Sequence, residues 1–164
     1  MKKVLVIVTA ALLLPSLALA AGRPSEPRLL VGNDVKFGNK MTQYTNLLRQ
    51  RLELSPLHND KCLQKAAYLK ASDMVRRKYF DHQGPSGDED FAKFVWKAGC
   101  HVDRLGENMT QGDETPHDAY SSLKSSRTHY PVMTRDFYHR MGVGVAHFDD
   151  DSEPNTYTVT YYAD

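Results

Sequence analysis

The spacing of hydrophobic residues changes once along this chain, and the change limits the folds that the chain can adopt. Between residues 42 and 98 the apolar side chains recur every three or four positions, as they do on one face of an α-helix. The segment MGVGVAHF, at 141–148, is instead a short apolar run, and the C-terminal TYTVTYYAD alternates two sets of side chains like a strand. Helices followed by strands are typical of the α+β class with an antiparallel sheet.

The first two helices are marked by capping and stop residues. Thr42 is a candidate N-cap for the first, and Pro56 stops it. Asp60 is a candidate N-cap for the second, which is expected to run to about Lys78. The side chains expected in the core of the protein are Leu48, Leu52, Leu69, Met74, Val143, Val145 and Val159.

Two shorter helices and one more strand are expected in the middle of the chain. A helix over 89–98 would end at Gly99, and another would open at Thr115 with a proline directly after it. Residues 107–109 are a candidate extended segment between these helices. With the two C-terminal strands, this segment would complete an antiparallel sheet.

The N-terminus has the pattern of a secretory signal peptide. Residues 1–20, MKKVLVIVTAALLLPSLALA, combine a basic start, an apolar run too short for a membrane span and a small-x-small cleavage signal. Cleavage after Ala20 would leave an exported protein, periplasmic or secreted, with no transmembrane segment. Residues 21–40 are rich in proline, glycine and charge, so we expect a flexible lead-in with little regular structure. Residues 41–164 have the length of one domain.

Charge and cysteine content narrow the classes of function. The chain carries 21 Lys and Arg against 20 Asp and Glu, so no strong positive field would attract nucleic acid. Cys62 and Cys100 are the only two cysteines. In an exported chain this favours one disulfide over two free thiols, and the lack of a CxxC pair argues against a metal site made from them.

Three polar residues stand at the ends of helices or beside glycines in separate segments. His82 follows an aromatic pair and precedes a Gly-Pro-Ser-Gly turn, Glu107 follows a glycine, and His129 follows the fourth helix. Imidazole and carboxylate groups suit a divalent metal such as zinc, and they also suit general acid–base chemistry. A surface histidine that has no such role remains an alternative for each position.

These residues belong to a series of four motifs: Tyr79-Phe80-Asp81-His82, Gly106-Glu107-Asn108, the stretch 123–129 ending in His129, and Gly142-Val143-Gly144. The order of the four motifs resembles that of the CAP superfamily (cysteine-rich secretory, antigen 5 and pathogenesis-related proteins) in its bacterial SCP-like form. The similarity extends from about Met41 to the C-terminus. The usual tryptophan of the third motif is Leu123 here, and the position of a second glutamate, found in many animal and plant members, is Ser126.

The resemblance implies a three-layer α–β–α sandwich, with helices on both faces of a central antiparallel sheet. It also implies a cleft that holds His82, Glu107 and His129, with Ser126 as a neighbour. We expect the two histidines to bind zinc or another divalent cation weakly, while Glu107 orients a bound water or one imidazole.

The expected function is that of an exported, non-catalytic protein that binds a lipid-like or small-molecule ligand, or an envelope or host protein. One alternative is a metal-assisted or acid–base peptide hydrolase in which Glu107 activates water. A second alternative is a structural envelope domain with an inert cleft.

Overall fold

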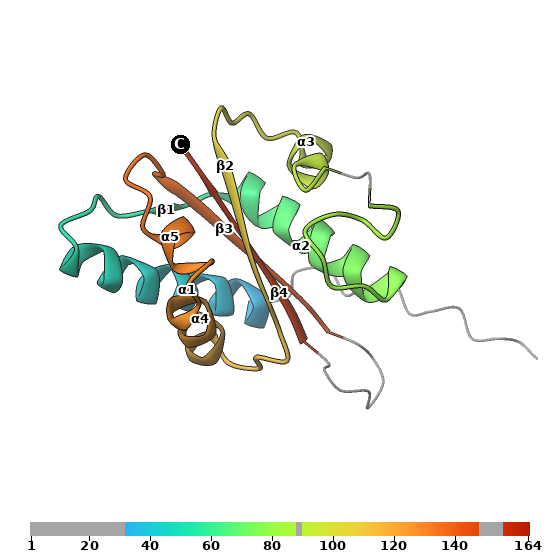
Figure 1. The fold of residues 1–164 in the computed structure, drawn as a ribbon, viewed down its shortest axis with the longest axis horizontal. Coiled ribbons are helices and arrows are strands. Elements are labelled where there is room, and N and C mark those ends of the chain that lie inside the picture. Colours follow the sequence, from blue (N-terminus) through green and yellow to red (C-terminus); the bar gives the residue numbers. More distant parts are fainter. Residues whose placement is uncertain (1–31, 88–89, 148–155) are drawn as a thin grey trace, which may run out of the picture.

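A four-stranded sheet forms the centre of the computed structural model, which describes residues 32–87, 90–147 and 156–164 (Figure 1). The strands lie in the order β1-β3-β4-β2. Strand β4 pairs antiparallel with both β2 and β3, and only the two-residue β1 pairs parallel, with β3. The elements are α1 (Gly32–Arg51), β1 (His58–Asn59), α2 (Lys61–Arg77), α3 (Lys93–Ala98), β2 (Leu105–Gln111), α4 (Pro116–Ser125), α5 (Tyr130–Met133), β3 (Arg140–His147) and β4 (Thr156–Ala163).

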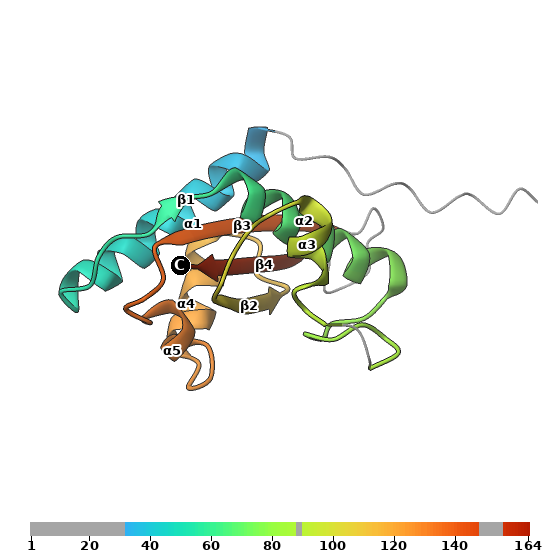
Figure 2. The ribbon, with the colours of Figure 1, turned by 90° about the horizontal axis from the view of Figure 1, so that it is seen from above.

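Helices cover both faces of the sheet, which confirms the expected α+β sandwich. Helices α2 and α3 pack on one face, and α1, α4 and α5 lie on the other. Alternate residues of β4 enter different cores: Val159 and Tyr161 pack with α2, while Tyr162 packs with α1 and α4. Because both faces are covered, every residue of β4 is buried, although its sequence alternates like that of a strand with one solvated face. Figure 2 shows β3, β4 and β2 side by side, with β2 at the edge of the sheet.

The Gly-Val-Gly motif of β3 lets α2 approach the sheet closely. A Cβ atom added to Gly142 would lie 2.2 Å from the backbone nitrogen of Gln64, and one added to Gly144 would lie 2.0 Å from that of Tyr68. Real Cβ atoms do not approach backbone atoms this closely, so any side chain at either glycine would push the helix off the sheet. This fourth motif therefore serves helix–sheet packing.

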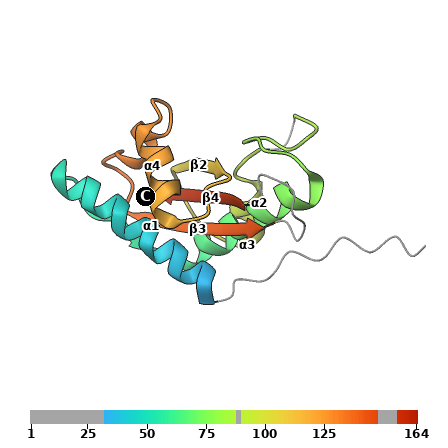
Figure 3. The same cartoon turned by 90° about the horizontal axis from the view of Figure 1, so that it is seen from below.

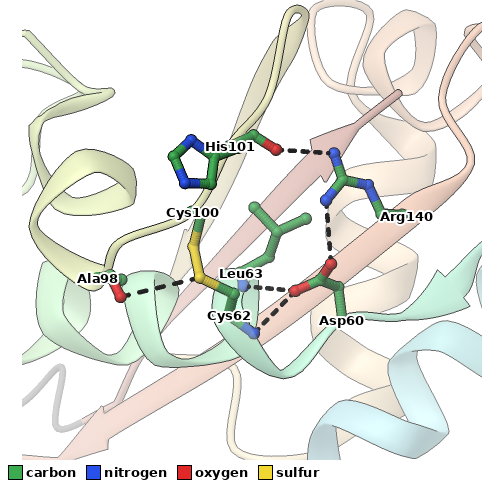
Figure 4. Close-up of a disulfide and its surroundings, with 7 residues drawn as sticks. All are labelled: Asp60, Cys62, Leu63, Ala98, Cys100, His101 and Arg140. Carbon is green, nitrogen blue, oxygen red and sulfur yellow. Dashed lines mark hydrogen bonds and ion pairs between the residues drawn. A yellow bond between two sulfur atoms is a disulfide. The ribbon is translucent and has the colours of Figure 1, made fainter.

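The predicted disulfide is present and joins the start of α2 to the turn after α3 (Figure 4). The Cα atoms of Cys62 and Cys100 are 5.6 Å apart, within the usual range. The predicted N-cap of α2 is also confirmed, because the Asp60 carboxylate accepts hydrogen bonds from the N–H groups of Cys62 (2.7 Å) and Leu63 (2.9 Å). Arg140, on β3, donates a hydrogen bond to the other Asp60 oxygen at 3.2 Å. The N-cap of α2 therefore connects the helix start, which carries the disulfide, to strand β3.

The N-terminal helix differs from the sequence prediction. It begins at Gly32, so 32–40, expected to have little regular structure, are helical, and Thr42 lies inside the helix rather than at its cap. The Thr42 hydroxyl is buried and donates a hydrogen bond to Asn59 Oδ1 at 2.6 Å, a partner that the local sequence cannot reveal. Residues 1–31, which include the expected signal peptide, lie outside the described residues. Within the described ranges, no helix is long and apolar enough to cross a membrane.

Two of the seven expected core residues were assigned wrongly. Leu52 is 42 % exposed, because α1 ends at Arg51 and the chain turns away from the core there. Leu69 is only partly buried and belongs to neither core cluster. The third helix is shorter than expected and begins at Lys93, whereas the predicted start of α4 after Thr115 is confirmed. The other five, which are Leu48, Met74, Val143, Val145 and Val159, are buried as expected.

Candidate functional site: a histidine–glutamate pair at the edge strand

The end of α2 places His82 by reversing the chain direction. Lys78 adopts the left-handed conformation, with φ 55°, and its N–H donates a hydrogen bond to the main-chain oxygen of Met74. This is the usual way in which a helix ends and its last carbonyls find partners. Of the aromatic pair that follows, Tyr79 is half-buried, and Phe80 is 39 % exposed and lies against the ring of Tyr157.

A buried lysine holds the main chain of the loop after α2. Lys70 is 1 % exposed, and its ammonium donates hydrogen bonds to the main-chain oxygens of Asp81 (2.7 Å) and His82 (2.9 Å). Sequence reasoning missed this residue. The available signal was its spacing, since Lys70 stands four residues after Ala66 and four before Met74, on the apolar face of the helix.

Glu107 binds the side chain of His82 directly. Glu107 lies on β2, its side chain is 1 % exposed, and its Oε1 is 2.6 Å from Nδ1 of His82, whose side chain is 49 % exposed. The hydrogen bond to Glu107 raises the pKa of His82, although partial burial of the ring opposes the shift. The pair is therefore a charged imidazolium–carboxylate contact over a wider pH range than an isolated histidine would allow.

Tyr161 supports Glu107 from the neighbouring strand. The two residues are directly paired across β2 and β4, on the face of the sheet that α2 covers. The Tyr161 hydroxyl donates to the main-chain oxygen of Phe91 at 2.9 Å. Burial, together with the nearby Glu107 carboxylate, raises the pKa of Tyr161, so the phenol stays neutral. Because Tyr161 is neutral, the charged group that contacts the Glu107 carboxylate among the described residues is the imidazolium of His82.

His129 reaches the same edge strand from the other face. It precedes α5, its main-chain oxygen accepts a hydrogen bond from Nδ2 of Asn108 at 3.1 Å, and its N–H lies 3.4 Å from the Ser126 hydroxyl. Neighbouring residues on a strand point to opposite faces, so Glu107 and Asn108 connect β2 to the two histidine segments from opposite sides. Figure 3 shows β2 between α4 and the loop that follows α2. Burial, and then the charge of His82, lower the pKa of His129.

The structure thus assembles part of the expected site. His82 and Glu107 are in contact, and His129 is coupled to His82 electrostatically. Ser126 is the C-cap residue of α4, and its hydroxyl forms a hydrogen bond with the Thr128 hydroxyl at 3.0 Å. Among the residues that the structure describes, no group of three or more His, Cys, Asp or Glu side chains is arranged to hold a metal ion. The described residues therefore do not form a zinc site with three or four protein ligands, and weak binding of a cation by two imidazoles and water stays a prediction.

Comparison with known proteins assigns the chain to a family. The family model described as "Cysteine-rich secretory protein family", CAP, matches residues 42–162, which contain all four motifs. A relative named Uncharacterized protein YkwD, from Bacillus subtilis (strain 168), is 32 % identical over 108 residues, which cover 66 % of this chain and 42 % of that protein. This chain therefore spans less than half the length of that relative.

Two solved structures share the fold. One is an extracellular protein containing a SCP domain from Bacillus anthracis str. Ames, with a TM-score of 0.69 and 18 % identity, over 84 % of this chain and 45 % of that one. The other is an outer surface protein from Borrelia burgdorferi, with a TM-score of 0.68 and 16 % identity, over 82 % of this chain and 95 % of that one. Sandwich, motif order and family model agree, and this chain belongs to the cysteine-rich secretory protein (CAP) family.

Proposed function

We propose that this protein is an exported CAP-domain binding protein without catalytic activity, which recognises a ligand or a partner protein at the His82–Glu107 pair. The observation that supports this proposal is the burial of Glu107, whose side chain is 1 % exposed and already in contact with His82 at 2.6 Å. A carboxylate that activates water must be within reach of that water. Here the carboxylate instead orients an imidazole that is half exposed.

The geometry favours a ligand that offers an anionic or carbonyl oxygen. Nδ1 of His82 is occupied by Glu107, so Nε2 is the ring nitrogen left to bind a ligand. The raised pKa of His82 keeps Nε2 protonated and positively charged at higher pH than usual. A lipid-like molecule with an acidic head group or a small organic acid would suit such a donor, and so would an acidic side chain of an envelope or host protein.

Export is supported by the leader sequence and by the character of the similar proteins. Residues 1–20 have the signal-peptide pattern, and the two similar structures are described as an extracellular protein and an outer surface protein. The disulfide between Cys62 and Cys100 also suits an oxidising compartment. We therefore place the ligand or partner beyond the inner membrane.

Ligand binding can be tested with a medium-chain fatty acid as an anionic, lipid-like probe. Calorimetric titration of the wild type should show binding, and His82→Gln should weaken it at least several-fold. His101→Gln is the matched control, since His101 is an exposed histidine at the disulfide end of the molecule. Native mass spectrometry of the exported protein would show any ligand that co-purifies. Equal affinity of wild type and His82→Gln would contradict the proposal, and a wild type that binds no probe would favour the inert envelope domain.

Weak binding of a divalent cation by His82 and His129 is a second property to test. Imidazole must lose its proton to bind a metal, and Glu107 raises the pKa of His82. Zinc affinity should therefore fall as the pH drops through a value above about 6.5, the ordinary histidine pKa. Calorimetry on the wild type, His82→Ala and His129→Ala would measure this. Zinc binding that is unchanged in both variants would place the cation elsewhere.

One observation favours the hydrolase alternative. A half-exposed histidine oriented by a buried carboxylate is the base–orienter half of many hydrolytic sites. The nearest candidate nucleophile, Ser126, bonds to the Thr128 hydroxyl and to the turn before α5. We expect the wild type to cleave a mixed peptide library no faster than His82→Ala or Glu107→Gln. Cleavage that disappears in both variants would favour the hydrolase.

A further inference from the structure

A residue of α2, Lys70, contacts the loop that carries His82, although it lies away from both His82 and Glu107 in the sequence. Glu107 is carried by the sheet, but His82 is carried by a loop that starts at the left-handed Lys78, and the described part of this loop contains no strand or helix. A side chain on such a loop meets its partner reliably only if the loop's main chain is also held. The loop therefore needs a second anchor besides the imidazole itself.

Lys70 supplies that anchor by binding two consecutive peptide oxygens. Its ammonium lies 2.7 Å from the main-chain oxygen of Asp81 and 2.9 Å from that of His82. It also lies 3.4 Å from the Tyr79 hydroxyl and 4.9 Å from the centre of the Tyr79 ring. The same cation thus contacts three of the four residues that lead from the helix end to the histidine.

The chemistry of Lys70 is costly for a residue that only fills space. Its side chain is 1 % exposed, and a buried ammonium is tolerated only when it is well hydrogen-bonded. A methionine would fill a similar volume on the apolar face of α2 without that desolvation cost. What a methionine could not do is to bind the oxygens of Asp81 and His82. What distinguishes Lys70 from an apolar residue is therefore its pair of hydrogen bonds to the main chain of the loop.

We propose that Lys70 is the positioning residue of this site: its buried ammonium holds the main chain at Asp81 and His82, so that the imidazole presents Nδ1 to Glu107. The inference rests on the proposed function only in taking the His82–Glu107 pair as the recognition element. It predicts that the state of the His82 ring depends on a residue that does not touch the ring.

The ring state can be read directly from the tautomer of His82. In a neutral histidine, the hydrogen bond made by one ring nitrogen decides which nitrogen keeps the proton. Nitrogen–proton correlation NMR at one fixed alkaline pH, where the ring is neutral, should show the proton on Nδ1 in the wild type. Glu107→Gln provides the reference spectrum for a ring without its carboxylate. Lys70→Met should shift the His82 nitrogen signals away from the wild-type pattern and toward an exchanging mixture of tautomers.

A control separates positioning from stability. Leu48→Ala removes a buried side chain of α1, on the opposite face of the sheet, and should leave the Nδ1–H signature intact in the folded protein. Retention of the wild-type signature in folded Lys70→Met would overturn the inference. Should Lys70→Met fail to fold, the wild type itself decides. The Lys70 ammonium should then show slow proton exchange and couplings across the hydrogen bonds to the carbonyl carbons of Asp81 and His82. Exchange as fast as that of exposed Lys65 would overturn the inference equally.

Failure of this inference is distinguishable from failure of the proposed function. The tautomer measurement needs no ligand, whereas the proposed function is tested by binding of the fatty-acid probe. If Lys70→Met loses the signature but binds the probe as the wild type does, Lys70 positions the pair, and the pair is not the recognition element. If the signature persists, Lys70 is not the positioning residue, whatever the probe shows.

Discussion

Among the described residues, one buried cation lies on each face of the sheet, and the two cations have different roles. Lys70, on the α2 face, bonds to the oxygens of two consecutive residues in one loop. Arg49, on the α1 face, is 0 % exposed and gathers segments that are far apart in the sequence. Its guanidinium donates to four main-chain oxygens at 2.8 to 3.0 Å, those of Ser55, Met133, Arg135 and Tyr138.

The contrast follows from the shapes of the two side chains. A guanidinium is a rigid planar fork with five donors, which suits several fixed carbonyls at once, while an ammonium is a compact charge on a flexible stem. Burial lowers the pKa of Arg49, but from so high a value that the group stays charged. Arg49 therefore supports the fold, because it joins the end of α1 to the chain before β3. Lys70 supports one loop, and we expect its loss to act locally.

Replacing Arg49 by methionine should have the largest effect on stability. Four main-chain oxygens would lose a charged donor, and we expect a loss of about 3–5 kcal/mol in the free energy of unfolding. Urea denaturation would measure it, with Arg51→Met as the control, since Arg51 is exposed and should change stability by no more than about 0.5 kcal/mol. A folded Arg49→Met variant that lost the Nδ1–H signature of His82 would break the contrast between the two cations.

Removal of the disulfide should come second. The double variant Cys62→Ser/Cys100→Ser should lose about 3–4 kcal/mol, since the bridge closes a long loop of the unfolded chain. The bridge holds the first turn of α2, whereas Lys70 and His82 lie toward the other end, so the His82 tautomer should not change. Mass spectrometry without reduction should show the wild type two hydrogens lighter than its reduced form. Two alkylatable thiols in freshly exported wild type would contradict the structure.

Two leucines of α2 sharpen the difference between core and surface on the Lys70 side. Leu63 is 0 % exposed and packs in the core between α2 and the sheet, so Leu63→Ala should lower the free energy of unfolding by about 2–5 kcal/mol. Leu69 is only partly buried, so Leu69→Ala should cost about 1 kcal/mol, within the range for partial burial. Urea denaturation of both variants would measure these losses. Equal losses for the two variants would mean that the face of α2 which packs on the sheet has been misassigned.

The pH dependence of the His82–Glu107 pair should be the smallest effect. Glu107 raises the pKa of His82, so the pair stabilises the fold fully below about 6.5, the unfolded value, and this contribution is lost as the pH rises through the higher folded pKa. Because the ring is 49 % exposed, we expect about 1 kcal/mol or less. The stability difference between wild type and Glu107→Gln, measured by urea denaturation from pH 6 to 9, should shrink as the pH rises. A difference that grows with pH would contradict this charge assignment.

Much of the fold was predictable because its signals are local. The Asp60 cap depends on one side chain reaching N–H groups two and three residues away, and the start of α4 after Thr115 depends on the same kind of contact. The strand pattern at 156–163 is likewise a property of neighbouring residues. The site was predictable in part, since motif order singled out His82, Glu107 and His129, but not which of them would touch.

The sequence by itself determined the α+β class and the pairing of Cys62 with Cys100, because periodicity, caps and a count of two cysteines need no knowledge of distant contacts. The order of the four motifs, through its resemblance to the CAP family, singled out the segments that contain His82, Glu107 and His129. Only the tertiary structure decided that Thr42 is an interior residue of α1, that Leu52 faces solvent, and that Lys70 and Arg49 are buried cations. It also decided that His82 pairs with Glu107 while His129 is tied to Asn108. The physical reason is that burial and hydrogen-bond partners depend on where the chain returns after long excursions, and local residue patterns carry no record of that return.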